Sequence, residues 1–257
     1  MEGQRAPALI PRSTGGSGVI VMTSMEKLKA KALIGYRKLT RPETIDIGGI
    51  RIPVDGEASG GLLNAFYGGY YERDELRLVK CTLQPDDVVM ELGTGIGLLS
   101  AYCAAKIGSE RVFTYEANPS LKDKIRSTYR LNHVAPSVEF CILGDRCGEQ
   151  TFYPSKNFWA SSTIQRNSRN QAIRVPMKSF NEEVRRIDPT FLIMDIEGGE
   201  YELMQYADLH NIRNVLMELH RGFIGEEKAD FVLSALQKSG FRINEELSHK
   251  QNLLLQR

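Results

Sequence analysis

The sequence is poor in the residues that mark several specialised protein classes. Its 257 residues include one tryptophan and four cysteines, and no two cysteines form a C-x-x-C pair. This argues against a disulfide scaffold and against a zinc ribbon. The sequence predicts buried free thiols and a cytoplasmic location.

Long apolar runs and an excess of one charge are also missing. No apolar run approaches the ~20 residues of a membrane span, and the short run at 18–22 has no cleavage-like pattern after it. The 33 basic residues nearly balance the 32 acidic ones, for a net charge of +1. We therefore expect no membrane partner and consider nucleic acid a poor candidate. The composition leaves the oligomeric state undefined.

The order of predicted elements indicates an α/β protein. Residues 1–24 have the composition of a flexible leader, and residues 25–66 are expected to form an extension of one helix and one hairpin. In residues 67–257, apolar strands alternate with amphipathic helices, which is typical of a parallel sheet covered by helices on both faces. Strands are predicted at 88–92, 112–116, 138–143, 191–196 and 214–220, followed by an antiparallel pair at 241–247 and 252–257.

The strongest local signal is VVMELGTGIGLLSAYCAA at 88–105, where a strand runs into a glycine-rich turn and then a helix. Glycines permit a sharp turn and close approach to a ligand, and the free N–H groups of the helix start favour electronegative ligand atoms. Glu116 ends the next strand, where an acid can accept hydrogen bonds from two ribose hydroxyls. This pattern predicts a nucleoside site.

The details of the turn favour one nucleoside over another. In the dinucleotide fingerprint G-x-G-x-x-G the third glycine would occupy position 98, which is Leu98, whereas this turn has Gly97. Glu91 would repel a pyrophosphate but suits a cationic ligand. S-adenosylmethionine, with its sulfonium and ammonium groups, is therefore favoured over NAD. An NAD-dependent oxidoreductase is the alternative enzyme. A tight strand-to-helix turn that binds no ligand would also explain the glycines.

Acidic residues follow a second predicted core strand, in FLIMDIEGGEYELM at 191–204. Ligands of doubly wound sheets bind beyond the carboxyl ends of the strands, near the switch in strand order. Asp195 and Glu197 would point to one side, toward the transferable methyl group, if the strand continued that far. Glu200 lies in the first turn of a helix, where the helix dipole explains an acid equally well.

Several segments together resemble known methyltransferases. E-L-G-T-G-I-G resembles motif I of class I methyltransferases, and D-I-E-G-G-E at 195–200 resembles the D-x-E-G-x-E signature of the FkbM-type family. M-E-L-H at 217–220, Y-Y-E at 70–72 and E-A-N-P at 116–119 are similar to further parts of that family's pattern. The resemblance covers roughly residues 67–221. It implies that residues 67–257 form a catalytic domain with the Rossmann-like class I methyltransferase fold, a seven-stranded, mostly parallel sheet.

The resemblance also implies a reaction, the S-adenosylmethionine-dependent O-methylation of a hydroxyl on a sugar or secondary metabolite. A small hydroxylated acceptor is the expected partner. A catalytically silent protein that binds the cofactor is a further alternative. His220, with an ordinary pKa near ~6.5, is a candidate general base, and Asp195 could take the proton directly or orient the hydroxyl.

The candidate residues fall into three sets. The cofactor set is Glu91, Gly93, Thr94, Gly95, Gly97, Glu116, Asn118 and Asp145, the last for the adenine edge. The catalytic set is Asp195, Glu197 and His220, and the substrate set is Tyr71, Glu72 and Trp159. Paired acids could also hold Mg²⁺, but no third oxygen ligand is evident from the spacing, so we expect no metal.

One segment has a distinct composition. Residues 151–181 contain no acid but five basic residues, several aromatics and the only tryptophan, Trp159. An insertion of this kind would overhang the active site, where aromatic faces suit sugar rings. A solvated loop with one aromatic anchor fits the composition equally well.

Overall fold

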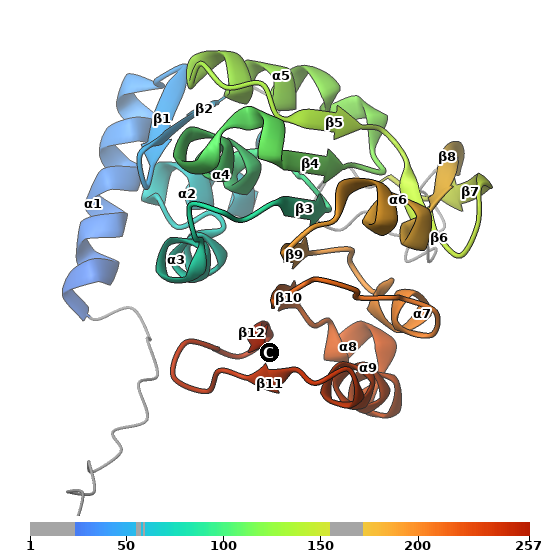
Figure 1. The fold of residues 1–257 in the computed structure, drawn as a ribbon. Helices are drawn as coiled ribbons and strands as arrows, with labels where there is room; N and C mark the ends of the chain where they lie inside the picture. Colours follow the sequence, from blue (N-terminus) through green and yellow to red (C-terminus); the bar gives the residue numbers. More distant parts are fainter. Residues whose placement is uncertain (1–23, 55–57, 59, 155–171) are drawn as a thin grey trace, which may run out of the picture.

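The computed structural model describes residues 24–54, 58, 60–154 and 172–257. Its main sheet has the strand order β11–β12–β10–β9–β3–β4–β5 (Figure 1). Five neighbouring strands are parallel: β10 (Asn214–Glu218), β9 (Phe191–Met194), β3 (Val89–Leu92), β4 (Val112–Tyr115) and β5 (Ser137–Glu139). β12 (Asn252–Gln256) is antiparallel to β10, and β11 (Arg242–Ile243) is antiparallel to β12. The predicted seven-stranded, mostly parallel sheet with a closing antiparallel pair is confirmed.

Helices cover both faces of this sheet (Figure 1). One face carries α3 (Arg73–Thr82), α4 (Leu98–Ile107) and α5 (Lys122–Leu131), and the other carries α6 (Phe180–Ile187), α7 (Glu200–Met204) and α9 (Glu226–Lys238). Alternate strand residues enter two separate cores. Ile193 and Leu216 pack on the first, and Met194 and Met217 on the second. The central strands are mostly apolar because both of their faces are buried.

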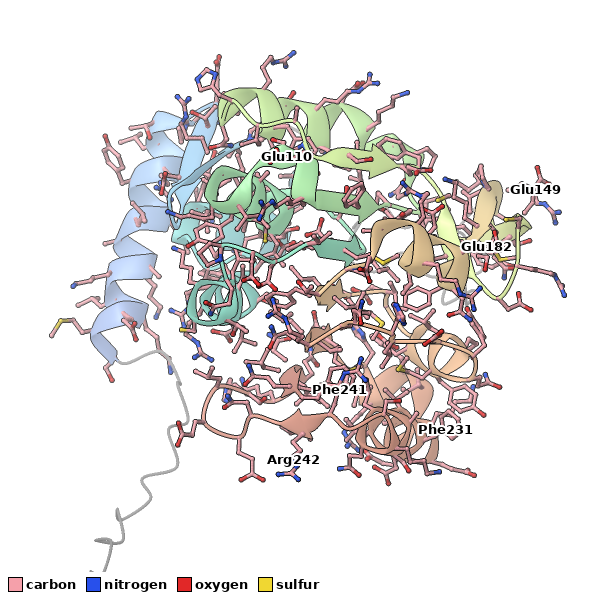
Figure 2. All side chains as sticks on the ribbon, viewed as in Figure 1. Glu110, Glu149, Glu182, Phe231, Phe241 and Arg242 are labelled. Carbon is pink, nitrogen blue, oxygen red and sulfur yellow. The ribbon has the colours of Figure 1, made fainter. Side chains whose placement is uncertain are left out.

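Side chains fill the space on both sides of the sheet (Figure 2). Four cysteines lie within the described residues, and all are free. Cys103 and Cys141 are buried, whereas Cys81 and Cys147 are exposed, so the predicted burial holds for two of the four. No helix in the described part of the chain is both long and apolar enough to cross a membrane.

In the described part of the chain, four elements precede α3: α1 (Ser24–Thr40), β1 (Thr44–Ile47), β2 (Ile50–Pro53) and α2 (Gly60–Gly68). The helix and the hairpin were both predicted, but the apolar stripe of the helix does not pack on the body. Leu28, Tyr36 and Leu39 are 69%, 65% and 84% exposed. Other residues attach α1 to the body: Ala30 is buried, Ile34 packs on the first core, and Arg37 donates to the carbonyl of Tyr67 at 2.9 Å.

A second, three-stranded sheet has the order β6–β8–β7 and consists of β6 (Ile142–Gly144), β7 (Gly148–Phe152) and β8 (Ile173–Ser179). The single strand predicted at 138–143 is therefore wrong. The chain leaves the main sheet after β5, and β6 pairs with β8. An apolar run does not specify its partner strand, so the transition could not be seen in the sequence. Trp159 lies outside the described residues.

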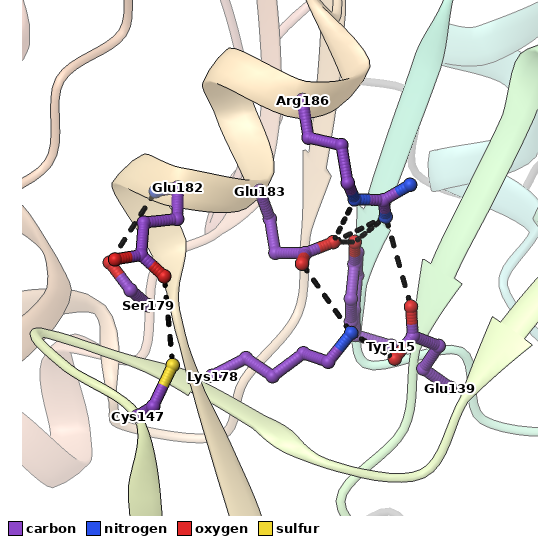
Figure 3. Close-up of polar contacts among 8 residues, drawn as sticks. All are labelled: Tyr115, Glu139, Cys147, Lys178, Ser179, Glu182, Glu183 and Arg186. Atoms are coloured by element: carbon purple, nitrogen blue, oxygen red, sulfur yellow. Dashed lines mark hydrogen bonds and ion pairs between the residues drawn. The ribbon is translucent and has the colours of Figure 1, made fainter.

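A polar network joins the second sheet and α6 to the edge of the main sheet (Figure 3). The Tyr115 hydroxyl donates to Glu183 at 2.5 Å, and Lys178 Nζ lies 2.5 Å from Glu139 and 3.4 Å from Glu183. Arg186 contacts Glu183 and Glu139. Lys178, one of the basic residues predicted to overhang the site, is thus paired with protein carboxylates.

Candidate active site

A cavity of about 780 Å³ opens at the carboxyl ends of β3, β4, β9 and β10. Its volume is within the range of small-molecule sites. Of the predicted cofactor residues, the cavity is lined by Gly93, Gly95, Glu116 and Asp145. Of the predicted catalytic and substrate residues, it is lined by Asp195, Glu197, Tyr71 and Glu72. Residues from both halves of the predicted site therefore line one cavity, although the predicted catalytic residue His220 does not line it.

The glycine-rich turn needs its glycines for two physical reasons. Gly93, Gly95 and Gly97 have φ values of 85°, 57° and 82°, which side-chain-bearing residues rarely adopt. A Cβ atom at Gly93 would also lie 1.8 Å from the carbonyl oxygen of Asp195. The backbone N–H of Asp195 donates to the carbonyl of Leu92 at 2.9 Å. The turn after β3 and the acidic segment after β9 are therefore in direct backbone contact.

Glu116 is fixed against this turn by backbone donors. The N–H of Gly95 donates to Glu116 Oε2 at 2.9 Å, and the N–H of Asn118 donates to Oε1 at 2.7 Å. Burial raises the pKa of Glu116 to about 7, although these backbone hydrogen bonds lower it. The carboxylate lies at the end of β4, where the sequence predicted a ribose contact.

Three predicted cofactor residues support the turn rather than line the cavity. The Thr94 hydroxyl donates to the carbonyl of Tyr115 at 3.3 Å. Asn118 Oδ1 accepts from the N–H of Ser120 at 3.1 Å and so caps the short helix η2 (Pro119–Leu121). Glu91 is 1% exposed, and burial raises its pKa to about 8, although hydrogen bonds from Ser100 and Thr94 lower it. None of the three, nor Gly97, lines the cavity.

Tyr71 and Glu72 enter the cavity from the segment before α3. Glu72 adopts a left-handed conformation with φ 45°, and Tyr71 packs edge-on against Phe66 at a centroid distance of 4.9 Å. A Cβ atom at Gly95 would lie 3.1 Å from the Tyr71 hydroxyl and 3.3 Å from Glu72 Oε1. Two of the three predicted substrate residues therefore border the glycine turn itself.

The predicted catalytic residues converge on one imidazole. β9 ends at Met194, so Asp195 and Glu197 do not extend the strand, and Glu197 has φ 51°. Even so, His220 Nε2 lies 3.7 Å from Asp195 Oδ1 and 3.5 Å from Glu197 Oε2. It also lies 3.8 Å from Glu218 Oε1, at the end of β10. Glu218 joins the cluster although the predicted catalytic set did not include it; the M-E-L-H segment was its signal.

Glu200 contacts the far side of the same ring. It is fully buried, and its Oε1 lies 2.6 Å from His220 Nδ1 and accepts the N–H of Gly198 at 3.2 Å. Burial lowers the pKa of His220, but the hydrogen bond to Glu200 and the neighbouring carboxylates raise it overall. The helix dipole is thus not the main reason for an acid at this position. Only the fold reveals this role, because the partner lies 20 residues further along the chain.

The cavity is strongly acidic. Its described lining contains no Lys, Arg or His side chain but eight acids: Glu72, Glu75, Glu116, Asp145, Asp195, Glu197, Glu202 and Glu218. Burial and the charges of Glu218 and Glu197 raise the pKa of Asp195 well above its usual range. Such a lining favours cationic and neutral ligands over anionic ones.

Comparison with known proteins gives one family match and several distant relatives. The family model described as "Methyltransferase FkbM domain" matches residues 87–243. The hexuronic acid methyltransferase AglP of Haloferax volcanii is 26% identical over 159 residues, which cover 59% of this chain and 63% of AglP. The AMB antimetabolite synthetase AmbE of Pseudomonas aeruginosa is 24% identical over 238 residues, 74% of this chain but 11% of AmbE. The chain thus spans less than two thirds of either relative.

Two solved structures with a similar chain course are methyltransferases at low identity. The methyltransferase FkbM from Methylobacillus flagellatus is 12% identical with a TM-score of 0.44, covering 79% of this chain and 56% of that one. The tRNA (uracil-54, C5)-methyltransferase of Pyrococcus abyssi, in complex with S-adenosyl-L-homocysteine, is 12% identical with a TM-score of 0.47, covering 84% and 43%.

Proposed function

Because this chain belongs to the methyltransferase FkbM family, we propose that it transfers the methyl group of S-adenosylmethionine to a hydroxyl of a sugar or secondary metabolite. One observation carries the proposal. Glycines of the turn and the acids around His220 line a single cavity, and the two segments are in backbone contact through Gly93 and Asp195. A cofactor on the turn therefore has an acid–imidazole cluster beside it.

The cofactor side of the cavity is assigned to the turn and the end of β4. Glu116 would accept hydrogen bonds from the ribose hydroxyls, and Asp145 would lie at the adenine edge. The sulfonium and ammonium groups are cationic, and the acidic lining favours them. NAD would bring a pyrophosphate into the same lining, which argues against the oxidoreductase alternative.

The acceptor side is assigned to Asp195, Glu197 and His220. In the reaction the S–CH₃ bond breaks as the O–CH₃ bond forms, S-adenosylhomocysteine leaves, and the hydroxyl proton passes to this cluster. In-line displacement depends chiefly on holding the oxygen opposite the sulfur. Removal of the proton by a positioned group contributes about 10²- to 10⁴-fold to such reactions.

The lining also narrows the acceptor class. A phosphorylated acceptor would meet carboxylates and no described basic side chain, so a neutral sugar or alcohol is favoured. AglP, by its name, acts on a hexuronic acid, which is a hydroxylated sugar with a carboxylate. Uronic acid and neutral sugar derivatives are therefore both included in the test.

The test uses the whole chain with methyl-labelled cofactor. Calorimetry should show binding of S-adenosylhomocysteine and not of NAD, and mass spectrometry should show an acceptor gaining one methyl on oxygen. Asp195→Asn and His220→Ala should keep cofactor binding and lose at least ~100-fold in methyl transfer. Wild-type rates in both variants would exclude the cluster from the mechanism. Cofactor binding without transfer to any tested acceptor would favour the catalytically silent alternative.

A further inference from the structure

Three potential metal-ligand atoms converge at the carboxyl ends of β9 and β10. The donor atoms of Asp195, Glu218 and His220 all lie within 4.8 Å of one another. Two ligands of a tetrahedral ion, each ~2.1 Å from it, are about 3.4 Å apart. His220 Nε2 lies 3.7 Å from Asp195 Oδ1 and 3.8 Å from Glu218 Oε1. These two distances exceed the value for a tetrahedral ion by a few tenths of an ångström.

The imidazole is oriented from behind. His220 is 5% exposed, and its Nδ1 lies 2.6 Å from the fully buried carboxylate of Glu200. With Nδ1–H donating to Glu200, the lone pair of Nε2 faces the carboxylates of the cavity. Metal-binding histidines are usually held in this way by a carboxylate on the other ring nitrogen. Glu218 is also supported from outside, because the side-chain amide of Gln251 donates to its Oε1.

One ligand atom lacks any other partner. Asp195 Oδ1 is inaccessible to solvent and has no hydrogen-bond partner among the described residues, although the side chain as a whole is 38% exposed. Buried polar atoms without a partner are rare in folded proteins and call for an explanation. The charged groups around Asp195 are the acids Glu218, Glu197, Glu72 and Glu75. A divalent cation would offset the repulsion among these acids.

We propose that Asp195, Glu218 and His220 bind one divalent metal ion that accepts mixed nitrogen and oxygen ligands, of the Mn²⁺ or Zn²⁺ type. An imidazole ligand disfavours Mg²⁺ and Ca²⁺, which prefer oxygen ligands only. The site goes beyond the proposed function, since ion binding is measurable without turnover. Three protein ligands leave a coordination position open to the cavity.

The ion would also change how the acceptor is activated. A metal ion lowers the pKa of a hydroxyl bound to it. His220 Nε2 is then used for coordination, and the hydroxyl proton passes to Glu197, whose Oε2 lies 3.5 Å from Nε2. This role, unlike the binding itself, rests on the proposed function.

The experiment measures uptake of the ion itself. Chelator-treated full chain is titrated with Mn²⁺, followed by electron paramagnetic resonance of the free ion, and with Zn²⁺ by calorimetry. We expect one ion per chain, with affinity lowered at least ~10-fold in Asp195→Asn and in Glu218→Gln. Glu202→Gln is the matched control, because Glu202 lines the same cavity but pairs with Lys228 at 3.5 Å. It should bind the ion as wild type does.

Two results would overturn the metal site. The first is wild-type chain that binds S-adenosylhomocysteine but takes up neither ion at millimolar concentration. The second is uptake that is unchanged in both ligand variants. Melting curves and S-adenosylhomocysteine binding establish that each variant is folded. Uptake without methyl transfer would support the site and count against the proposed function. Methyl transfer by chelator-treated protein that takes up no ion would support the proposed function and overturn the metal site.

Discussion

Replacing Glu91, which lies beneath the glycine turn, by glutamine should remove a loss of stability that the protein undergoes as pH rises. Glu91 is buried, and its Oε2 has no hydrogen-bond partner among the described residues. Its pKa is about 8 in the folded protein against an ordinary value of 4.5. Between these values the folded state binds the proton and the unfolded state does not. Rising pH therefore lowers the free energy of unfolding, by up to about 1.4 kcal/mol per pH unit.

The size of the change in the free energy of unfolding follows from the pH range between the two pKa values of Glu91. Glutamine resembles the protonated acid in shape but does not ionise. From pH 5 to pH 8 the free energy of unfolding of Glu91→Gln should rise relative to wild type by about 3 to 4 kcal/mol. Titrating groups that do not interact with Glu91 act equally in both proteins and cancel in the difference. Glu116, whose charge also raises the pKa of Glu91, is the neighbouring acid that titrates in the same range.

Urea unfolding of the ligand-free proteins at the two pH values tests this prediction. Glu110→Gln is the control, because it removes the same charge at an exposed position and should follow wild type. If Glu91→Gln and wild type differ in free energy of unfolding by the same amount at pH 5 and at pH 8, the reasoning is refuted.

Two further substitutions test the contacts of the site. Gly93→Ala should destabilise the fold by clearly more than Gly49→Ala and should weaken S-adenosylhomocysteine binding. Both glycines have positive φ, but only a Cβ atom at Gly93 would meet the Asp195 carbonyl. Equal urea midpoints of the two variants would argue against this contact. Glu200→Ala should lower the free energy of unfolding by about 1–3 kcal/mol and reduce methyl transfer, because it leaves His220 Nδ1 buried without an acceptor. Glu200→Gln keeps an acceptor and should retain most of the methyl transfer activity. Equal rates in the two Glu200 variants would rule out a positioning role.

The parallel core and the place of the site could be predicted from the sequence. β9 is apolar throughout, and β3 and β10 are mostly apolar, because helices cover both faces of these strands. The switch in strand order then implies that Gly93 and Asp195, about a hundred residues apart, lie side by side. The backbone of the two residues is in contact, as this strand order implies.

Other parts of the site depend on contacts that no local pattern encodes. Glu200 has a sufficient local explanation at a helix start, and its bond to His220 exists only once β10 lies beside β9. Glu91 suits a cationic ligand by its position, yet its side chain lies beneath the turn with Ser100. The direction of one side chain at a strand end depends on the packing of the neighbouring helix.

The backbone contact between Gly93 and Asp195 has a consequence for engineering. Since neither segment can shift without displacing the other, the reactive geometry is set by a part of the molecule that tolerates little variation. The second sheet is attached to the main sheet through side chains, in the network of Lys178, Glu183 and Arg186. Gln150, Phe152 and Met177 of this sheet line the cavity, so substitutions at these three positions should alter acceptor preference while Asp145 and the catalytic apparatus stay unchanged.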